Sequence, residues 1–245
     1  MIILAFDTSS SLGSVALGDG EGGVLARRFI RDQGAHASAL IPAIRDVLED
    51  AGVARSAVDR VVVGAGPGSF TGLRVAAATA KGLVRSLGIP LWAVSSLAAG
   101  AVTGRLRIPG LDPPTTELRD MELPCFVLFD ARSDRIYGAC YRVANGRLEV
   151  LRAPFAGRME EVLRSDLPGD VLFCGQGARR HQERVEDAGF RVLPAPAGIP
   201  TADSLLEVVA LGGEDDGIVE HVTDPGRWEP AYLRAWKPAR ERKAG

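Results

Sequence analysis

The amino-acid sequence predicts an α/β protein made of two similar halves, each containing a β-β-β-α-β-α module. Two observations support this prediction. Short strand-like runs, some alternating and some wholly apolar, are interleaved with runs of helical period. The order of these runs in residues 1–103 then recurs in residues 125–222, which indicates an internal duplication. A chain of 245 residues is long enough to bury sizeable cores without disulfides or metal ions.

The first half is expected to begin with an antiparallel meander, because three alternating runs are separated by turns rich in serine and glycine. An amphipathic stripe that includes Leu40, Ile44 and Leu48 then predicts a helix, and Gly52 ends it. A buried strand, a glycine turn and a second helix follow, in the order of a βα unit. The strands are expected at residues 2–7, 14–17, 24–30, 61–63 and 91–94, and the helices at 36–51, 71–87 and 95–103.

The second half is separated from the first by residues 104–124, a stretch with four prolines and no hydrophobic period, which predicts a linker or long loop. Beyond it the opening pattern repeats, with Asn145 and Gly146 as a hairpin turn. Strands are expected at residues 126–129, 136–143, 148–151 and 170–174, and helices at 159–163, 178–188 and 201–211. Residues 223–245 form a tail that is expected to pack back on the first half.

Composition excludes several classes of protein. Hydrophobic residues make up 46% of the chain and charged residues 24%, as in ordinary globular proteins, and no apolar run approaches the roughly 20 residues that span a bilayer. The chain opens on a strand-like run with no basic segment or cleavage site before it, so we expect a cytoplasmic protein. Cys125, Cys140 and Cys174 are far apart and lie in apolar runs, which predicts buried, reduced thiols.

A net charge of −2 argues against a protein that grips nucleic acid alone, because such binding needs a concentrated basic face. Any contact with RNA is expected to be shared with a partner. Residues 227–245 carry six basic side chains against two acidic ones. This run is typical of a solvated tail, and contact with an RNA backbone is the alternative.

Four segments carry a resemblance to a known family. Residues 6–9 read FDTS, residues 66–74 read GPGSFTGLR, residues 130–137 contain DAR and IY, and residues 230–234 read PAYLR. Together they resemble the TsaB family, formerly called YeaZ. The nine-residue glycine run is the most specific of the four. The resemblance covers most of residues 1–100, then 126–141 and the tail, and it is weak in the linker and in 152–213.

The resemblance implies a duplicated actin-like (ASKHA, RNase H-like) fold of two lobes, each a mixed sheet flanked by helices. It also implies a non-catalytic scaffold in the machinery that places threonylcarbamoyl on the anticodon-loop adenosine of tRNA. The implied partners are TsaD, a catalytic paralogue, and TsaE, an ATPase, with tRNA reached through the complex and a homodimer in isolation. No tightly bound cofactor is implied, although ATP or ADP would fit a composite site in the complex.

Asp7 and Asp130 stand at equivalent strand ends of the two halves. Kinases that share the implied fold use such aspartates to hold a metal–water shell around a phosphate, so Asp7, Thr8, Ser9 and Asp130 are candidates for a weak, vestigial anion site lining one cleft. Arg132 is a candidate to neutralise either carboxylate. The structural alternative is an aspartate that hydrogen-bonds its own turn. The functional alternative is a self-sufficient ATP-dependent phosphotransferase of the ASKHA type. A peptidase is disfavoured because no pair of nucleophile and base is recognisable.

The glycine turn at 66–72 permits positive φ and close approach of another backbone. It can cradle an anion at the start of the following helix, or it can be a tight turn that shapes a partner-facing edge; we favour the second use because the Walker lysine is missing. A metal site is not expected, because His36 is followed four residues later by Leu40, whereas the catalytic paralogue carries a His-x-x-x-His pair. His181 and His221 are isolated, and no catalytic residue is predicted.

The helix at 71–87 is apolar on nearly all sides, which is typical of a helix buried on more than one side. Either the chain itself covers both sides, or this helix and the one at 36–51 pack against a matching pair in a related molecule. The predicted partner-facing residues are His36, Leu40, Ile44, Gly66, Gly68, Phe70, Gly72, Arg74, Val75, Ala76, Ala78, Thr79 and Gly82.

Overall fold

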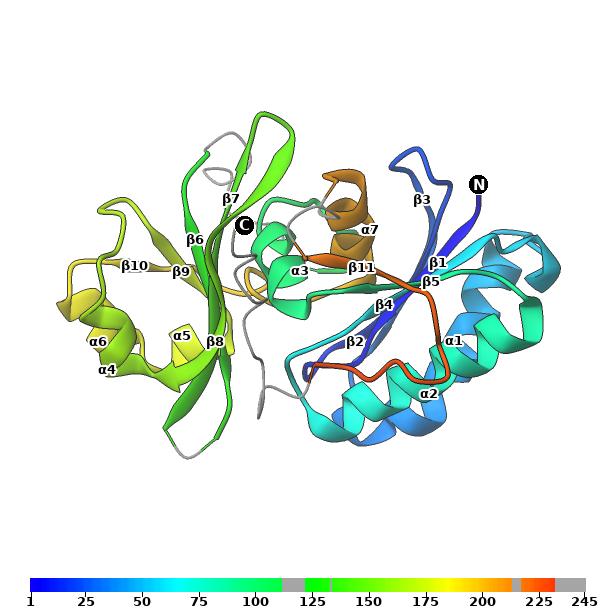
Figure 1. The fold of residues 1–245 in the computed structure, drawn as a ribbon, viewed down its shortest axis with the longest axis horizontal. Coiled ribbons are helices and arrows are strands. Elements are labelled where there is room, and N and C mark those ends of the chain that lie inside the picture. The colour runs from blue at the N-terminus through cyan, green and yellow to red at the C-terminus, as the bar shows by residue number, and fades with distance from the viewer. Residues whose placement is uncertain (112–121, 133, 213–216, 232–245) are drawn as a thin grey trace, which may run out of the picture.

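The computed structural model describes residues 1–111, 122–132, 134–212 and 217–231. Two β-sheets lie side by side, and each has helices packed against it (Figure 1). Much of the predicted linker and residues 232–245 of the predicted tail, with Tyr232, Leu233 and Trp236, fall outside the described residues.

The first sheet has six strands in the order β11-β5-β4-β1-β2-β3. Strands β1, β2 and β3 form an antiparallel meander, and β4 and β5 extend it in parallel from β1. The strands are β1 (Ile3–Asp7), β2 (Gly13–Gly18), β3 (Val24–Ile30), β4 (Arg60–Gly64), β5 (Leu91–Val94) and β11 (Val219–Val222). Strand β1 is wholly buried because helices cover both faces of the sheet.

The second sheet repeats this plan with five strands in the order β10-β9-β6-β7-β8. Strands β6, β7 and β8 form the meander, and β9 and β10 run parallel to β6. The strands are β6 (Cys125–Asp130), β7 (Arg135–Ala144), β8 (Arg147–Arg158), β9 (Leu172–Cys174) and β10 (Arg191–Val192). The repeated topology confirms the predicted α/β class and the duplicated actin-like plan.

Helices α1 (His36–Asp50) and α2 (Phe70–Leu87) cover one face of the first sheet, and α3 (Ser96–Thr103) and α7 (Ala202–Ala210) pack on the other (Figure 1). Helix α2 begins at a cap in which the Ser69 side chain accepts from the backbone N–H of Gly72. It ends at Gly88, whose φ of 69° suits a glycine after a helix. The remaining helices are α4 (Met159–Leu163), α5 (Gln176–Arg180), α6 (Gln182–Asp187) and two short 3₁₀ turns, η1 (Gln33–Ala35) and η2 (Arg55–Ala57).

Two elements that the sequence assigned to the second half belong structurally to the first. The predicted helix at 201–211 exists as α7, but it packs on α3 and the first sheet, where Leu205 and Val208 are buried. Strand β11 lies within the range expected for the second half but was not predicted as a strand; it pairs antiparallel with β5 and completes the first sheet. Local periodicity predicts that a helix or strand forms, but it does not reveal which sheet offers the apolar surface that the element covers.

The interior is organised around one core that both sheets share. Helix α3 is buried along its whole length between the sheets, and its apolar side chains pack against residues of both. A second core lies under α1 and α2 and includes Trp228 from the described part of the predicted tail, 223–231. A third lies between the second sheet and helices α4 to α6. Among the described residues, no helix is long and apolar enough to cross a bilayer.

Candidate functional site

A cleft of about 750 Å³ separates the two halves. One wall is formed by the turn between β1 and β2, by the glycine turn and by the start of α2. The other wall is formed by the end of β6, by Tyr137 of β7 and by Gln176 at the start of α5. Ser9, Ser11 and Thr71 line the first wall, and Asp130 and Arg132 line the second.

Asp7 lies behind the first wall of the cleft and not on it. Its side chain has no exposed surface. Oδ1 accepts hydrogen bonds from Ser9 N at 2.6 Å and Ser9 Oγ at 2.7 Å, and Oδ2 accepts one from Ser96 Oγ at 2.8 Å. Burial raises the pKa of Asp7 above its ordinary value, although these hydrogen bonds oppose the rise. The expectation that both carboxylates line one cleft is therefore wrong for Asp7. Its carboxylate is instead hydrogen-bonded to Ser9 of its own turn and to Ser96 of α3.

The glycine turn is fastened to the β1–β2 turn by its backbone. Ser69 N donates to the Ser9 carbonyl oxygen at 2.7 Å, and Thr8 Oγ1 donates to the Gly72 carbonyl oxygen at 2.7 Å. A Cβ atom on Gly68 would collide with the Ser9 carbonyl oxygen, and one on Gly72 would collide with that of Thr8. These glycines are needed because one backbone packs directly on another. The turn is thus used for close packing within the chain.

Ser96 connects the glycine turn with the β1–β2 turn through hydrogen bonds to Gly66 and Asp7. Its backbone N–H donates to the Gly66 carbonyl oxygen at 2.9 Å, and its Oγ accepts from Gly66 N at 3.1 Å. The same hydroxyl group donates to Asp7. Ser95 caps α3, and Ser96, the first residue of that helix, was not among the predicted site residues. No local signal marks Ser96, because its partners lie 30 and 89 residues away.

Asp130 differs from Asp7 although the two occupy equivalent strand ends. Its side chain is 27% exposed and faces the cleft. Oδ2 accepts from Arg180 Nη1 at 2.6 Å, and Oδ1 accepts from the backbone N–H of Arg132 at 2.9 Å. The ion-pair partner of Asp130 is therefore Arg180 of α5, which the sequence analysis missed, and Arg132 contributes a backbone hydrogen bond. A pairing across 50 residues leaves no local pattern in the sequence.

Within the described residues, no group of three or more His, Cys, Asp or Glu side chains could hold a metal ion. His36 is buried at the start of α1 and its Nε2 has no hydrogen-bond partner. His181 Nε2 lies 3.8 Å from Asp134 Oδ1, and the ring of His221 meets that of Trp92 edge-on at 6.1 Å. These histidines come from three different parts of the fold.

The predicted partner-facing residues divide into two groups. Six of them are buried within the chain's own core and turns, which corrects the prediction that they face a partner: His36, Leu40, Ile44, Gly66, Gly72 and Ala76. Leu40, Ile44 and Ala76 are buried because they lie on the faces of α1 and α2 that pack on the first sheet, whereas Gly72 is buried where its turn packs against the backbone of Thr8. The remaining seven are exposed or half-buried: Gly68, Phe70, Arg74, Val75, Ala78, Thr79 and Gly82.

The exposed side of α1 and α2 carries two large apolar side chains. Phe70 is 55% exposed and Ile41, which the sequence analysis did not select, is 54% exposed. The guanidinium carbon of Arg74 lies 3.9 Å from the centre of the Phe70 ring, a distance at which cation and ring attract each other. Ala78 and Gly82 continue the row that begins at Phe70 and Arg74, with one residue per helical turn. We call Ile41, Phe70, Arg74, Ala78 and Gly82 the α1–α2 surface.

Comparison with known proteins identifies the family. The family profile described as TsaD, tRNA N6-adenosine threonylcarbamoyltransferase, matches residues 21–198. The chain is 35% identical to the tRNA threonylcarbamoyladenosine biosynthesis protein TsaB of Bacillus subtilis (strain 168), over 76% of each chain. The chain belongs to the TsaB (YeaZ) family. It is also 28% identical to TsaB of Escherichia coli (strain K12), over 97% of each chain.

A solved structure of a TsaB-family protein agrees with the fold. The structure described as YeaZ from Pseudomonas aeruginosa is 30% identical, with a TM-score of 0.74, and the match covers 95% of this chain and 99% of that one. The resemblance stated from the sequence is therefore confirmed, and so is membership of the tRNA threonylcarbamoyladenosine system. A profile of TsaD-type enzymes that matches most of a TsaB-family chain indicates that the two proteins share an ancestral fold.

Proposed function

We propose that this TsaB-family protein is a non-catalytic scaffold that binds a TsaD-type catalytic protein and thereby supports transfer of threonylcarbamoyl from threonylcarbamoyl-AMP to the tRNA adenosine. The chemistry lies in the partner. The proposal depends on a contrast between two parts of the first half. The carboxylate of Asp7 is fully buried and hydrogen-bonded to Ser9 and Ser96, whereas the α1–α2 surface leaves the apolar side chains of Phe70 and Ile41 exposed.

The positions of the two strand-end aspartates support the proposal that this chain is non-catalytic. In a phosphotransferase of this fold, both strand-end carboxylates would need access to the phosphate or its metal–water shell. Here Asp7 has no exposed surface, and Asp130 is held by Arg180. Moving Asp7 toward the cleft would break three hydrogen bonds to Ser9 and Ser96.

The α1–α2 surface supports the partner-binding part. Large apolar side chains that stay exposed beside small residues are typical of protein interfaces, because the small residues let two helices approach closely. A partner that shares the fold would offer a matching helix pair, which gives a four-helix contact. Two copies of this chain could use the same surface when the partner is absent, which predicts a homodimer in isolation.

We further propose that TsaE joins the assembly with ATP or ADP at a composite site, that tRNA is reached through the complex, and that the protein acts in the cytoplasm. Membership of the tRNA threonylcarbamoyladenosine system supports these assignments. The net charge of −2 supports a shared contact with RNA, because the chain lacks a large excess of cations.

The test is reconstitution. The chain is co-purified with the TsaD-type and TsaE-type proteins of its own organism, and threonylcarbamoylation of tRNA is assayed with each protein omitted in turn. We expect product to be lost without this chain, and the chain alone to give neither product nor magnesium-dependent ATP hydrolysis. Robust ATP turnover by the isolated chain would favour a phosphotransferase and contradict the scaffold.

A further inference from the structure

The chain crosses between the two halves twice. Residues 104–124 lead from α3 to β6, and residues 193–201 lead from β10 back to α7. A hinge rotation that opens or closes the cleft needs backbone dihedral angles to change in both crossings, because each of them is tied to both halves. The second crossing, residues 193–201, lies wholly within the described residues, and its contacts determine whether it can bend.

The second crossing is hydrogen-bonded to both halves at once. Toward the second half, the Ala197 carbonyl oxygen accepts from Gly175 N at 3.3 Å and from Arg179 Nη1 at 2.9 Å. Toward the first half, Gly198 N donates to the Gly100 carbonyl oxygen of α3 at 3.1 Å. The carbonyl oxygen and the N–H belong to one peptide group and point in opposite directions. A single buried peptide group, between Ala197 and Gly198, therefore binds both halves.

Three glycines allow the two halves to come this close. Gly198 has a φ of 77° and Gly175 a φ of 94°, which glycine adopts without strain. A Cβ atom on Gly198 would collide with the backbone of Gly175. One on Gly100 would lie 3.2 Å from Val127 Cγ1 of β6 and 3.3 Å from the carbonyl carbon of Gly198. Backbone packs on backbone here, so no flexible side chain at this point can absorb a change in the angle between the halves.

Helix α3 makes further contacts with the second crossing and the second sheet. Thr103 Oγ1 donates to the Ile199 carbonyl oxygen at 2.6 Å. Ser95, the cap of α3, has its Oγ 3.4 Å from the hydroxyl oxygen of Tyr141 in β7, which is within hydrogen-bonding distance. A rotation of one half against the other would have to break these bonds as well as those of the central peptide group.

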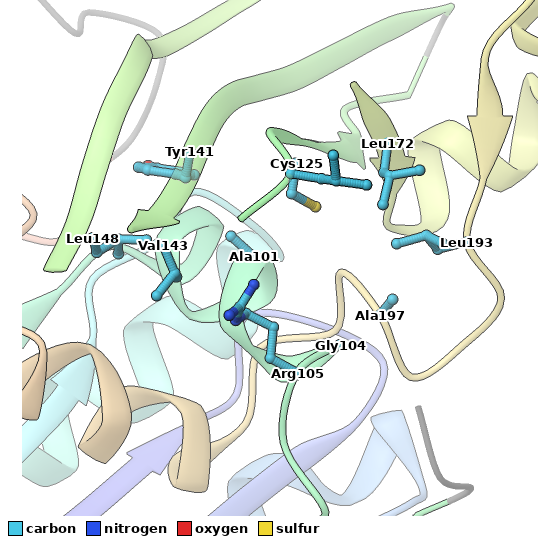
Figure 2. A pocket seen from close by; sticks show the side chains of 11 residues that line it. Ala101, Gly104, Arg105, Cys125, Tyr141, Val143, Leu148, Leu172, Leu193 and Ala197 are labelled. Carbon is cyan, nitrogen blue, oxygen red and sulfur yellow. The ribbon is translucent and has the colours of Figure 1, made fainter. Parts of the chain in front are cut away.

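Little free space remains beside this contact. A pocket of about 20 Å³ lies between α3, the second sheet and the second crossing (Figure 2). Ala101 lines it from α3, Tyr141 and Leu148 from the second sheet, and Leu193 and Ala197 from the second crossing. Its volume is enough for one molecule of about the size of water. The halves are thus packed almost without voids where a hinge would have to move.

We propose that the peptide group between Ala197 and Gly198 fixes the angle between the two halves, so that the cleft keeps one width in the free chain and in its complexes. Many proteins that bind a ligand between two domains close around it by hinge rotation. In this chain such a rotation breaks hydrogen bonds on one side of the peptide group or on the other.

A fixed angle has a consequence for assembly, which rests on the proposed function, whereas the fixed angle itself does not. The α1–α2 surface belongs to the first half, and Asp130 lies on the cleft wall of the second. A partner that touches both halves would meet them at a constant spacing. It would lose no free energy in fixing their orientation when it binds.

The test measures the orientation of the two halves in solution. Residual dipolar couplings of backbone N–H groups in both sheets are recorded on the deuterated full-length chain, first alone and then with an unlabelled TsaD-type protein. We expect both sheets to fit one alignment tensor of one magnitude in the free chain, and one common tensor again in the complex. Two different tensors in either state would overturn the proposal. Failure of the TsaD-type protein to bind would count against the proposed function, while the couplings of the free chain would still decide the angle.

Gly198→Ala is the variant that should release the halves, because its Cβ atom would meet the backbone of Gly175. We expect its two sheets to lose the common tensor. Gly82→Ala is the matched control, since nothing lies within 4 Å of its Cβ position, and it should behave as wild type. If Gly198→Ala does not fold, Thr103→Val replaces it, because it removes the hydroxyl group that reaches Ile199 and should make the two tensors differ by a smaller amount. A common tensor in the folded variant would contradict the proposal.

Discussion

At the scale of single residues, Asp7 and Asp130 show how a duplicated position can acquire two different roles. Each is the last residue of the first strand of its half. Asp7 accepts three hydrogen bonds from Ser9 and Ser96 and is buried, whereas Asp130 remains in the cleft with Arg180. The difference arises because Ser96 offers a hydroxyl group behind Asp7 and draws its carboxylate into the first half.

Replacing Asp7 by Asn tests this burial. The raised pKa of Asp7 means that the folded state favours the protonated acid. This contribution to stability is fully present below the unfolded pKa and is lost as the pH rises through the folded pKa. The stability of wild type relative to D7N should therefore be greatest in acid and fall toward neutral pH, by about 1.4 kcal/mol for every tenfold change in proton affinity. Urea unfolding of both proteins at several pH values measures it, and an advantage of wild type that grows toward neutral pH would contradict the burial.

Replacing Gly72 by Ala tests the contact between the two turns. The new Cβ atom would collide with the Thr8 carbonyl oxygen, and a backbone atom cannot move aside cheaply. We expect a loss of about 1–3 kcal/mol in the free energy of unfolding. Gly82→Ala is the matched control in the same helix, because nothing lies within 4 Å of its Cβ position, and it should stabilise by about 0.5–1 kcal/mol. Equal stabilities of the two variants in thermal unfolding would exclude the steric effect.

At the scale of elements, α2 has two sides with different uses. Ala76 is fully buried toward the first sheet, whereas Ala78, two residues later, is exposed. A helix of 3.6 residues per turn separates these positions by more than half a turn. The partner-binding proposal therefore concerns the row of Phe70, Arg74 and Ala78, and not the buried stripe.

This geometry gives a paired prediction. Ala78→Arg should weaken association with the TsaD-type partner by at least about tenfold, because a large charged side chain would block close packing of helices, and should change stability by less than about 0.5 kcal/mol. Ala76→Arg should instead unfold the protein, because it buries a charge in the core. Calorimetric binding and thermal unfolding of the two variants distinguish these effects. Undiminished binding by A78R would move the interface elsewhere.

The helices and strands themselves were largely predictable, because hydrophobic period and turn residues are local properties of the sequence. The predicted helix at 159–163 coincides with α4, and the glycine turn lies where it was expected. The side chains that complete the site were not predictable in this way. Ser96 and Arg180 act through contacts across 89 and 50 residues, and the direction in which His36 and Ala76 point depends on which sheet the helices cover.

At the scale of the whole molecule, the cleft separates two halves that remain joined by the shared core around α3. The cleft is large enough for a nucleotide, so its volume alone does not decide the function. Our proposal rests instead on the accessibility of Asp7 and Asp130. A site for magnesium and a nucleotide needs carboxylate oxygens that can reach the metal and the phosphates.

Addition of magnesium and ATP to the isolated chain should leave its thermal unfolding temperature unchanged. A ligand that binds only the folded state at 100 times its Kd would stabilise the protein by about 2.7 kcal/mol, which a thermal shift assay detects readily. Magnesium with ADP is the parallel measurement, and a known ATPase of the same fold serves as the positive control. A clear upward shift with ATP would show that the cleft retains a nucleotide site.

The antiparallel pairing of β11 with β5 also constrains how the chain is made. A ribosome releases the polypeptide from its N-terminus, so the first 103 residues emerge while their outermost strand has not yet been synthesised. Strand β5 can pair with Val219 and Val222 of β11 only after the whole second sheet has left the exit tunnel. Nascent chains halted before residue 219 should therefore be sensitive to protease and dependent on chaperones, and they should become resistant once β11 is available.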